Sequence, residues 1–499
     1  MKTIQNTLLM AALVSLLGAG CATYKDQAKT MTGAWSGGRP DLATKQFSAK
    51  ADKKDNSKDG VIWNLEAATA YRAIGDYTNS NRYFDQAVAQ IEDYEQKAKV
   101  RVGNEIGAMM SNLQTLPYEG KSYDKIMLHT YRALNYLALG ESEKARPEII
   151  RAYQRQQDAV DENAKRIEKA REAEDLRKSK AHTEATKPNQ DTVKPDQDQA
   201  KVDKDQEKAA KAQALADKAK ADPKVSAALE SVTKDLEGFK FYADYVNPFT
   251  VYLDGLFFLH AGSGGSDLER AIKSLNRVVE VAGENKFVQA DLQAATNALT
   301  GQLPSPCTYV LFETGQAASL GQLRIRIPII VTKVSYVGAA FPKLERHTGE
   351  APHLLISAGD AQERTAPLAS IDAVIALGFK NEFPVVVTKT MVAVVAKGVA
   401  AYTINQAAGQ QSDLGGLFAQ VITAVAQDAV NIADTRSWTT LPKEFQVARI
   451  PTPANRTLTV ATDGGSPTEV KLLEGTVNVV YVKSITATSP LLISQFKLK

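Results

Sequence analysis

The chain has 499 residues, of which 44% are hydrophobic, and its formal net charge at pH 7 is only +3. A chain of this length holds one to three domains and has enough apolar residues for a packed core. The near-neutral charge gives no bulk attraction to nucleic acid, so we expect no nucleic-acid partner. Two cysteines, Cys21 and Cys307, are too few for a disulfide framework.

The N-terminal segment has the order of an export signal. Lys2 precedes an apolar run from 8 to 17, which is followed by Gly18-Ala19-Gly20-Cys21. The run is shorter than the roughly 20 residues that span a membrane, and the order resembles a bacterial lipoprotein signal peptide over residues 1–20. The resemblance implies a lipid on Cys21 and, because Ala22 follows, an outer-membrane location that faces the periplasm. The alternative is an ordinary cleavage site beside a cysteine that carries no lipid.

After this signal, a polar segment is followed by residues with the periodicity of helices. Residues 21–60 are rich in small and charged residues and predict a tether. Over 61–153, apolar residues recur at three- and four-residue spacing in two pairs of helices, with turns at Gly75 and Gly140. A looser continuation follows over 225–300 and ends with a helix over 286–299. This pattern resembles tetratricopeptide repeats and predicts an all-α, tetratricopeptide-like helical solenoid. An irregular helical bundle is the alternative.

Residues 154–224 interrupt the helical units with a highly charged insertion. Charged residues, Ala and Gln predict a long helix that leads out and another that returns, while Pro188 and Pro195 predict a disordered tip between them. The apolar residues from Val225 to Phe239 recur at the spacing of a helix-pair seam. We interpret the insertion as a tolerated surface feature, and an arm that reaches a partner or the cell wall is the alternative.

From residue 305 to 499 the pattern predicts an α+β domain with a mainly antiparallel sheet. The stretch from Gln322 to Ile327 alternates strictly between polar and apolar residues, as a half-buried strand does. We expect helices over 371–379, 387–407 and 417–432 within this domain. The last two contain few charges, which favours a buried layer over the sheet; docking on a membrane or a partner is the alternative.

The candidate chemical groups are sparse. The histidines are His129, His182, His260, His347 and His353. They show no metal-binding spacing, and the chain has no phosphate-loop or nucleophile motif, so we expect no metal, no cofactor and no catalytic residue. Cys307 stands in an apolar run and is interpreted as a buried hydrophobic residue. Glu313, at a strand end, could act as an acid or base, but the sequence supplies no partner for it, and a role in turn formation is favoured.

Several phrases of the chain resemble a family of bacterial lipoproteins with tetratricopeptide-like repeats. They include Tyr242-Ala-Asp-Tyr-Val-Asn-Pro-Phe249, Leu311-Phe-Glu-Thr-Gly315 and Asp434-Thr-Arg-Ser-Trp-Thr-Thr-Leu-Pro442. The resemblance covers nearly the whole mature chain. It implies a periplasmic role near envelope or peptidoglycan assembly, and it brings no known catalytic residues.

These observations favour a non-enzymatic lipoprotein that acts as a protein–protein interaction scaffold. The membrane is one expected partner, through Cys21, and a periplasmic or outer-membrane protein is the other. Tyr71 and Tyr136 are the candidate aromatic anchors in the repeat groove, although their positions favour packing between helices. The alternatives are an envelope enzyme that acts on peptidoglycan through Glu313, and a purely structural tether.

Overall fold

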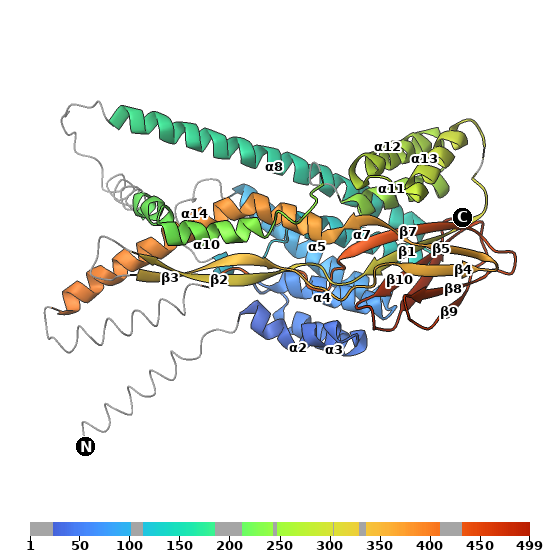
Figure 1. The fold of residues 1–499 in the computed structure, drawn as a ribbon, viewed down its shortest axis with the longest axis horizontal. Coiled ribbons are helices and arrows are strands. Elements are labelled where there is room, and N and C mark those ends of the chain that lie inside the picture. Colours follow the sequence, from blue (N-terminus) through green and yellow to red (C-terminus); the bar gives the residue numbers. More distant parts are fainter. Residues whose placement is uncertain are drawn as a thin grey trace, which may run out of the picture.

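The computed structural model describes residues 23–100, 113–184, 212–242, 247–302, 304–328, 336–409 and 432–499. It shows a helical N-terminal part and a C-terminal part with mainly antiparallel sheets, as the sequence predicted (Figure 1). Cys21 lies outside the described residues, as does nearly all of the helix predicted over 417–432.

Pairs of helices joined by short turns make up most of the N-terminal part. Gly75 and Gly140 end the first helix of two such pairs with φ of 80° and 76°, a conformation that glycine adopts without steric cost. Both predicted turns are therefore confirmed. In chain order the helices are α2 (Tyr24–Ser36), α3 (Pro40–Lys54), α4 (Gly60–Ala73), α5 (Tyr77–Val100), α7 (Ser122–Ala138), α8 (Ser142–Glu184), α10 (Pro223–Lys234), α11 (Pro248–His260), α12 (Gly265–Ala282) and α13 (Lys286–Leu299).

The tether predicted over 21–60 is wrong for most of its length, because residues 24–54 form the packed helices α2 and α3. Thr23 begins α2 with a capping box that also uses Asp26. Ala28, Met31 and Trp35 then recur at helical spacing and are buried. The polar residues that suggested a tether cover the outer faces of these helices.

The charged insertion begins as predicted, because α8 continues from the second helix pair to Glu184 without a break. The predicted tip lies outside the described residues. The seam beginning at Val225 lies outside the helical array. On α10, Val225, Leu229 and Val232 share a small apolar cluster with alanines of the helical stretch 212–220, as a helix-pair seam would, and with the strands β2 (Ser319–Pro328) and β3 (Tyr336–Glu345) and the helix α14 (Ile371–Gly409). The predicted array over 225–300 therefore begins only at α11.

Three sheets form the C-terminal part. A five-stranded sheet has the order β11-β10-β1-β7-β6, β2 and β3 form a long hairpin, and a four-stranded sheet has the order β5-β4-β8-β9. Among the described strands, β1 and β10 are the one parallel pair. The strands are β1 (Cys307–Thr314), β2 (Ser319–Pro328), β3 (Tyr336–Glu345), β4 (Leu354–Ala358), β5 (Ala361–Arg364), β6 (Ala366–Ser370), β7 (Glu444–Pro451), β8 (Thr457–Thr462), β9 (Thr468–Lys471), β10 (Val477–Ser484) and β11 (Leu492–Lys497).

The two helices predicted over 371–379 and 387–407 are one helix, α14 (Ile371–Gly409), with Pro384 inside it. The helix continues past the proline because its apolar side chains, among them Phe379, Phe383 and Val387, pack beside the β2–β3 hairpin. The buried layer predicted here is confirmed only up to Ala396, because the side chains beyond that residue and nearly all of the helix predicted over 417–432 lie outside the described part of the chain. No helix in the described ranges is long and apolar enough to cross a membrane.

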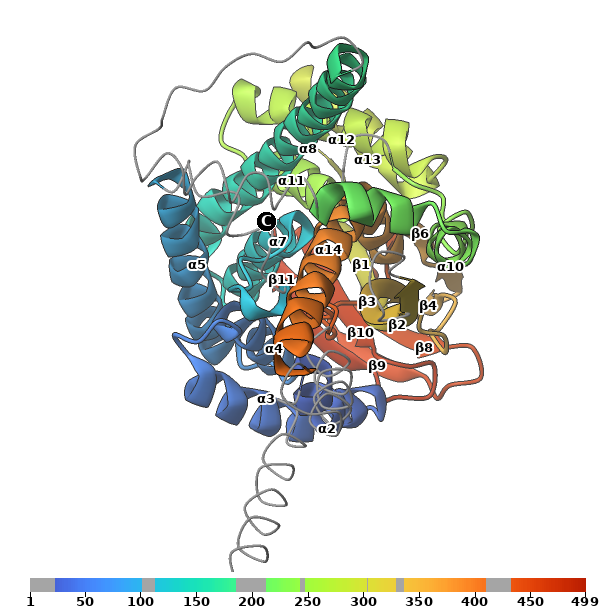
Figure 2. The same ribbon diagram turned by 90° about the vertical axis from the view of Figure 1, so that its left-hand side faces the viewer.

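The helices cover one face of the five-stranded sheet. Because successive side chains of a strand alternate, Tyr309 and Glu313 of β1 share a face. The Tyr309 hydroxyl lies 2.9 Å from Nε2 of His260 on α11, and the Tyr131 hydroxyl of α7 donates to Glu313 at 3.1 Å. Figure 2 shows the helices in an arc around the C-terminal strands. One continuous apolar core joins the helical and β parts.

Candidate functional site

The inner face of the helical arc is filled by the C-terminal part of the same chain. The Trp438 side chain lies between Phe84 and Tyr131, with ring centroids 6.1 and 6.0 Å away. Its indole N–H donates to Thr69 Oγ1 on α4 at 3.0 Å. The segment 434–442, which was noted in the sequence only for a family resemblance, therefore occupies the groove where the sequence predicted a partner.

Glu66 holds this segment against α4. The carboxylate is fully buried and accepts hydrogen bonds from the Tyr24 hydroxyl at 2.8 Å, from the backbone and hydroxyl of Thr439 at 2.7 and 2.6 Å, and from the backbone of Thr440 at 3.1 Å. Burial raises the pKa of Glu66, which these donors oppose. One carboxylate thus joins α2, α4 and the inserted segment.

The two predicted aromatic anchors do not form a common binding surface. Tyr71 stacks on Tyr83 of α5 with ring centroids 5.5 Å apart. Tyr136 is half-buried, and the Lys144 ammonium of α8 lies 5.8 Å from its ring. Each tyrosine therefore contacts the second helix of its own pair, which is the packing role that the sequence also allowed.

Glu313 lies at the centre of a buried polar cluster between sheet and helices. The strand register places it beside Lys483 of β10, whose ammonium donates to it together with the hydroxyls of Tyr131 and Tyr481. Burial lowers the pKa of Lys483, and the nearby Glu313 opposes this shift. The Arg72 guanidinium packs over the Tyr481 ring at 4.7 Å.

This cluster lines a cavity of about 290 Å³ near the turn after α4. A general base needs a free lone pair that faces its substrate. Three donors already occupy the Glu313 carboxylate, so its geometry is that of a paired acceptor that closes the helix–sheet interface.

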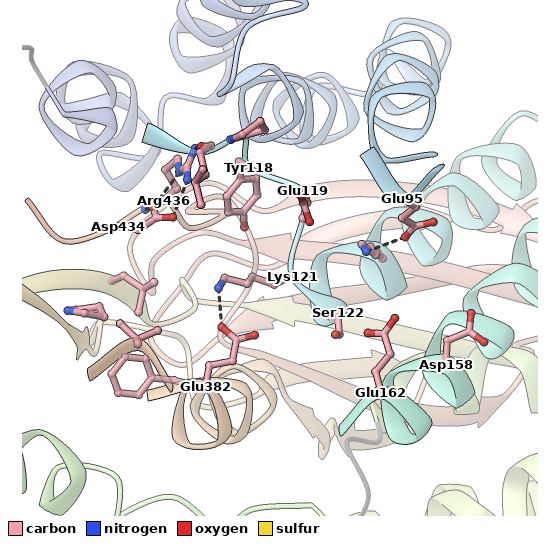
Figure 3. A pocket seen from close by; sticks show the side chains of 18 of the residues that line it. Glu95, Tyr118, Glu119, Lys121, Ser122, Asp158, Glu162, Glu382, Asp434 and Arg436 are labelled. Carbon is pink, nitrogen blue, oxygen red and sulfur yellow. Dashed lines mark hydrogen bonds and ion pairs between the residues drawn. The ribbon is translucent and has the colours of Figure 1, made fainter. Parts of the chain in front are cut away.

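A larger cleft, of about 900 Å³, opens where α7, α8, α14 and the β2–β3 hairpin meet. Figure 3 shows Lys121 and Ser122 at its floor, Asp158 and Glu162 on α8 at one wall, and Glu382 on α14 opposite. We call it the junction cleft. Ligand sites occur preferentially at such junctions between structural units.

The α8 wall of the junction cleft is charged. Arg155, Asp158, Glu162 and Lys165 recur every three or four residues and therefore project from one side of the helix. Arg155 is bound to Glu95 of α5, with 3.0 Å between Nη1 and Oε1. Asp158 accepts a hydrogen bond from the Gln154 side chain at 3.1 Å, whereas Glu162 and Lys165 are exposed to a ligand.

The opposite wall is mainly apolar. Phe379, Phe383 and Val386 of α14 recur at the same helical spacing, and Leu320 and Pro342 of the hairpin extend the surface. The Phe379 and Phe383 rings stack with centroids 5.1 Å apart and are largely buried, so they back this wall, whereas Val386 is partly exposed. The cleft is thus polar on one side and apolar on the other.

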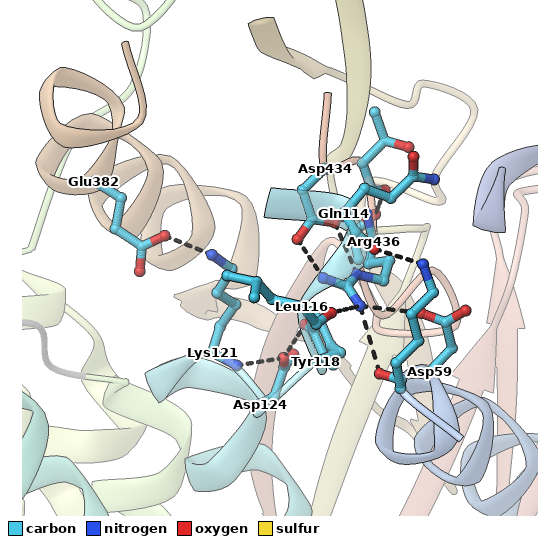
Figure 4. A network of polar contacts seen from close by, with 12 residues as sticks. Asp59, Gln114, Leu116, Tyr118, Lys121, Asp124, Glu382, Asp434 and Arg436 are labelled. Atoms are coloured by element: carbon cyan, nitrogen blue, oxygen red, sulfur yellow. Dashed lines mark hydrogen bonds and ion pairs between the residues drawn. The ribbon is translucent and has the colours of Figure 1, made fainter. Parts of the chain in front are cut away.

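A network of ion pairs fixes the floor between these walls (Figure 4). The buried Arg436 guanidinium donates to Asp434 at 2.7 Å, to Asp59 at 3.0 Å and to the Leu116 carbonyl at 2.8 Å. Lys121 and Glu382 connect α7 to α14 with 2.6 Å between Nζ and Oε2. These contacts join segments far apart in sequence at the base of the cleft.

Asp124 supports the floor from beneath. Its Oδ2 accepts from the Tyr118 hydroxyl and from the Lys121 backbone at 2.8 Å, whereas its Oδ1 is buried without a partner in the described structure. Burial raises the pKa of Asp124 to about 6, and the two donors oppose this shift.

The sequence interpretation did not include any residue of the junction cleft as a site. The spacing of Asp158, Glu162 and Lys165 was visible, but it lay in a segment that was interpreted as a solvated surface insertion. The Arg436 contacts required knowledge of the fold, because Asp59 and Arg436 are 377 residues apart in the chain.

The remaining titratable candidates are dispersed. His347 lies 3.0 Å from the Ser319 hydroxyl, and His353 Nε2 lies 3.1 Å from an Asp463 oxygen, so the two contact different partners. Cys307 is buried, as predicted. In the described ranges, no three His, Cys, Asp or Glu residues gather as metal ligands would.

No family model, curated protein or solved structure matches the chain. The likeness to repeat-containing lipoproteins stays a prediction from the sequence phrases alone.

Proposed function

We propose that the chain is a non-enzymatic lipoprotein of the outer membrane that faces the periplasm and acts as a protein–protein interaction scaffold. Its paired helices would serve as a tetratricopeptide-like array. The order of Lys2, the apolar run and Cys21 supports the lipid anchor. The phrases shared with a lipoprotein family support a role near envelope or peptidoglycan assembly.

The observation that carries this proposal is the contrast between two surfaces. The inner face of the arc is occupied by the chain's own Trp438 and Glu66 contacts. The junction cleft is large and open, and it has one polar and one apolar wall. A partner would therefore bind at the junction cleft, while the inner face of the helices organises the fold.

The packed α2 places the body close to the proposed anchor. The first described helix starts at Tyr24, three residues after Cys21. Three residues reach at most about 11 Å when fully extended. A lipid on Cys21 would hold the folded body next to the membrane surface, so an accessible partner would be a membrane protein or a periplasmic protein that approaches the membrane.

Chemical cross-linking of the intact chain in living cells, followed by mass spectrometry, tests this function. We expect one recurrent protein partner, and membrane association that is lost in Cys21→Ser. Absence of any recurrent partner would contradict the scaffold, and membrane association that persists in Cys21→Ser would contradict the anchor.

An envelope enzyme is the second candidate, because Glu313 and Lys483 line the 290 Å³ cavity. The three donors on Glu313 make this candidate the weaker one. Purified chain incubated with peptidoglycan sacculi is expected to release no soluble fragments. Release that disappears in Glu313→Gln, with folding retained, would establish the enzyme instead.

A further inference from the structure

We propose that the junction cleft binds about two turns of a cationic amphipathic helix from its partner. This inference rests on the proposed scaffold function and specifies the chemistry of its site. Three properties of the cleft point to such a ligand: the balance of its unpaired charge, its two different walls, and its volume.

The charge that the cleft offers to a ligand is negative. Its cations are largely neutralised within the chain: Lys121 pairs with Glu382, Lys125 and Arg155 pair with Glu95, and Arg436 pairs with Asp434 and Asp59.

By contrast, Glu119, Asp161 and Glu162 are exposed and have no ion-pair partner within the described ranges. Among the described cations that line the cleft, Lys165 alone is likewise exposed and has no ion-pair partner. Complementary charge therefore calls for a basic ligand.

The two walls select a ligand with two different faces. Asp161 and Glu162 of α8 would face basic side chains, while Phe383 and Val386 of α14 would contact apolar ones. A helix with basic residues along one side and apolar residues along the other presents both faces at once. Recognition of an amphipathic helix in a groove is a common binding mode.

The volume sets the length of the bound segment. A helix is about 10 Å across and rises 1.5 Å per residue, so a volume of about 900 Å³ holds roughly seven or eight residues. That is about two turns. Because the cleft is open to solvent along one side, a longer helix could extend beyond it.

Fluorescence anisotropy of synthetic peptides tests this chemistry. The probe is a labelled 14-residue peptide of Leu and Lys arranged as an amphipathic helix, added to the full chain held in nanodiscs of phosphatidylcholine. Empty nanodiscs measure partition into lipid. Two matched peptides, one with Glu in place of each Lys and one with the same composition shuffled so that no apolar face forms, test charge and amphipathicity separately.

Variants of the two walls locate the binding. We expect Asp161→Asn with Glu162→Gln to weaken binding about 3- to 10-fold, as two exposed ion pairs would, and Val386→Ser to weaken it about 5-fold. Glu143→Gln on α8 and Val385→Ser on α14 are matched controls, since both positions are exposed but do not line the cleft. They should leave the affinity unchanged. Raising the salt concentration should reduce the affinity of the wild type for the peptide more than it reduces the affinity of the Asp161→Asn, Glu162→Gln double variant.

The possible results separate the two levels of the proposal. Equal binding of the Glu peptide, or binding that neither wall variant weakens, would overturn the cationic-helix inference. A partner that cross-links in cells while none of the peptides binds would overturn the inference and leave the scaffold function in place. Failure of both experiments would overturn both.

Discussion

The hydrogen bonds of Glu66 give a sharp prediction for the coupling between the helical and β parts. Glu66→Ala removes the acceptor for four hydrogen bonds, which come from Tyr24, Thr439 and Thr440. Each buried donor left without a partner costs about 1–3 kcal/mol. Removing a buried carboxylate, whose pKa burial raises, returns part of this cost. We therefore expect a loss of about 3–5 kcal/mol in the free energy of unfolding.

The assay is chemical denaturation followed by two probes. Far-ultraviolet circular dichroism reports mainly on the helices, and fluorescence reports on Trp35, Trp63 and Trp438, all of which are buried. Because one core joins the parts, both probes should shift together to lower denaturant. Glu66→Gln keeps one acceptor oxygen and the shape of the side chain. Its loss in the free energy of unfolding should therefore be about half that of Glu66→Ala.

Two results would refute this reasoning. A loss below about 1 kcal/mol would show that the Glu66 hydrogen bonds do not hold the inserted segment. A fluorescence shift with an unchanged helical transition would show that the helices fold independently of the sheet. Glu143→Ala, an exposed position on α8, should change stability by no more than about 0.5 kcal/mol and serves as the control.

Three further predictions concern single buried or turn residues. Burial raises the pKa of Asp124 from 3.8 to about 6, so the wild type loses stability as the pH rises through this window. In denaturation experiments, the free energy of unfolding of Asp124→Asn should rise by up to about 3 kcal/mol relative to that of the wild type as the pH is raised from 4 to 7. A difference between the two proteins that does not change with pH would contradict the burial argument. Glu313→Gln leaves the buried Lys483 without its counter-charge and should cost about 3–5 kcal/mol by thermal unfolding, whereas a neutral effect would show that the pair is dispensable. Gly75→Ala meets no atom within 4 Å but must adopt a φ of 80°, so it should cost about 1–2 kcal/mol, and a smaller loss would show that the turn relaxes.

Periodicity in the sequence predicted the elements that follow local rules. The helix over 286–299 and the alternating strand around Gln322–Ile327 appear where their patterns placed them. The turns at Gly75 and Gly140 follow from the need for a positive φ. These features depend on neighbouring residues alone, which is why a single sequence predicts them.

The errors arose where distant residues decide the structure. The helix α2 was interpreted as a tether because its polar surface outweighs its apolar face, and the packing of Trp35 is visible only in the fold. The sequence predicted a break between residues 379 and 387, yet packing beside the hairpin keeps α14 continuous through Pro384. The junction cleft was missed for the same reason, since its walls come from α8 and α14, which are more than 200 residues apart.

The location of the partner site is the central claim, and site-specific photo-cross-linking tests it most directly. A photoreactive residue is introduced at Glu162 in the cleft, at Tyr136 in the helical array, or at the exposed control position Glu143 on α8. Intact cells are irradiated and cross-linked products are identified. We expect a discrete product from position 162 and none above background from the other two. A product from position 136 with none from position 162 would contradict the account and return the partner to the helical array.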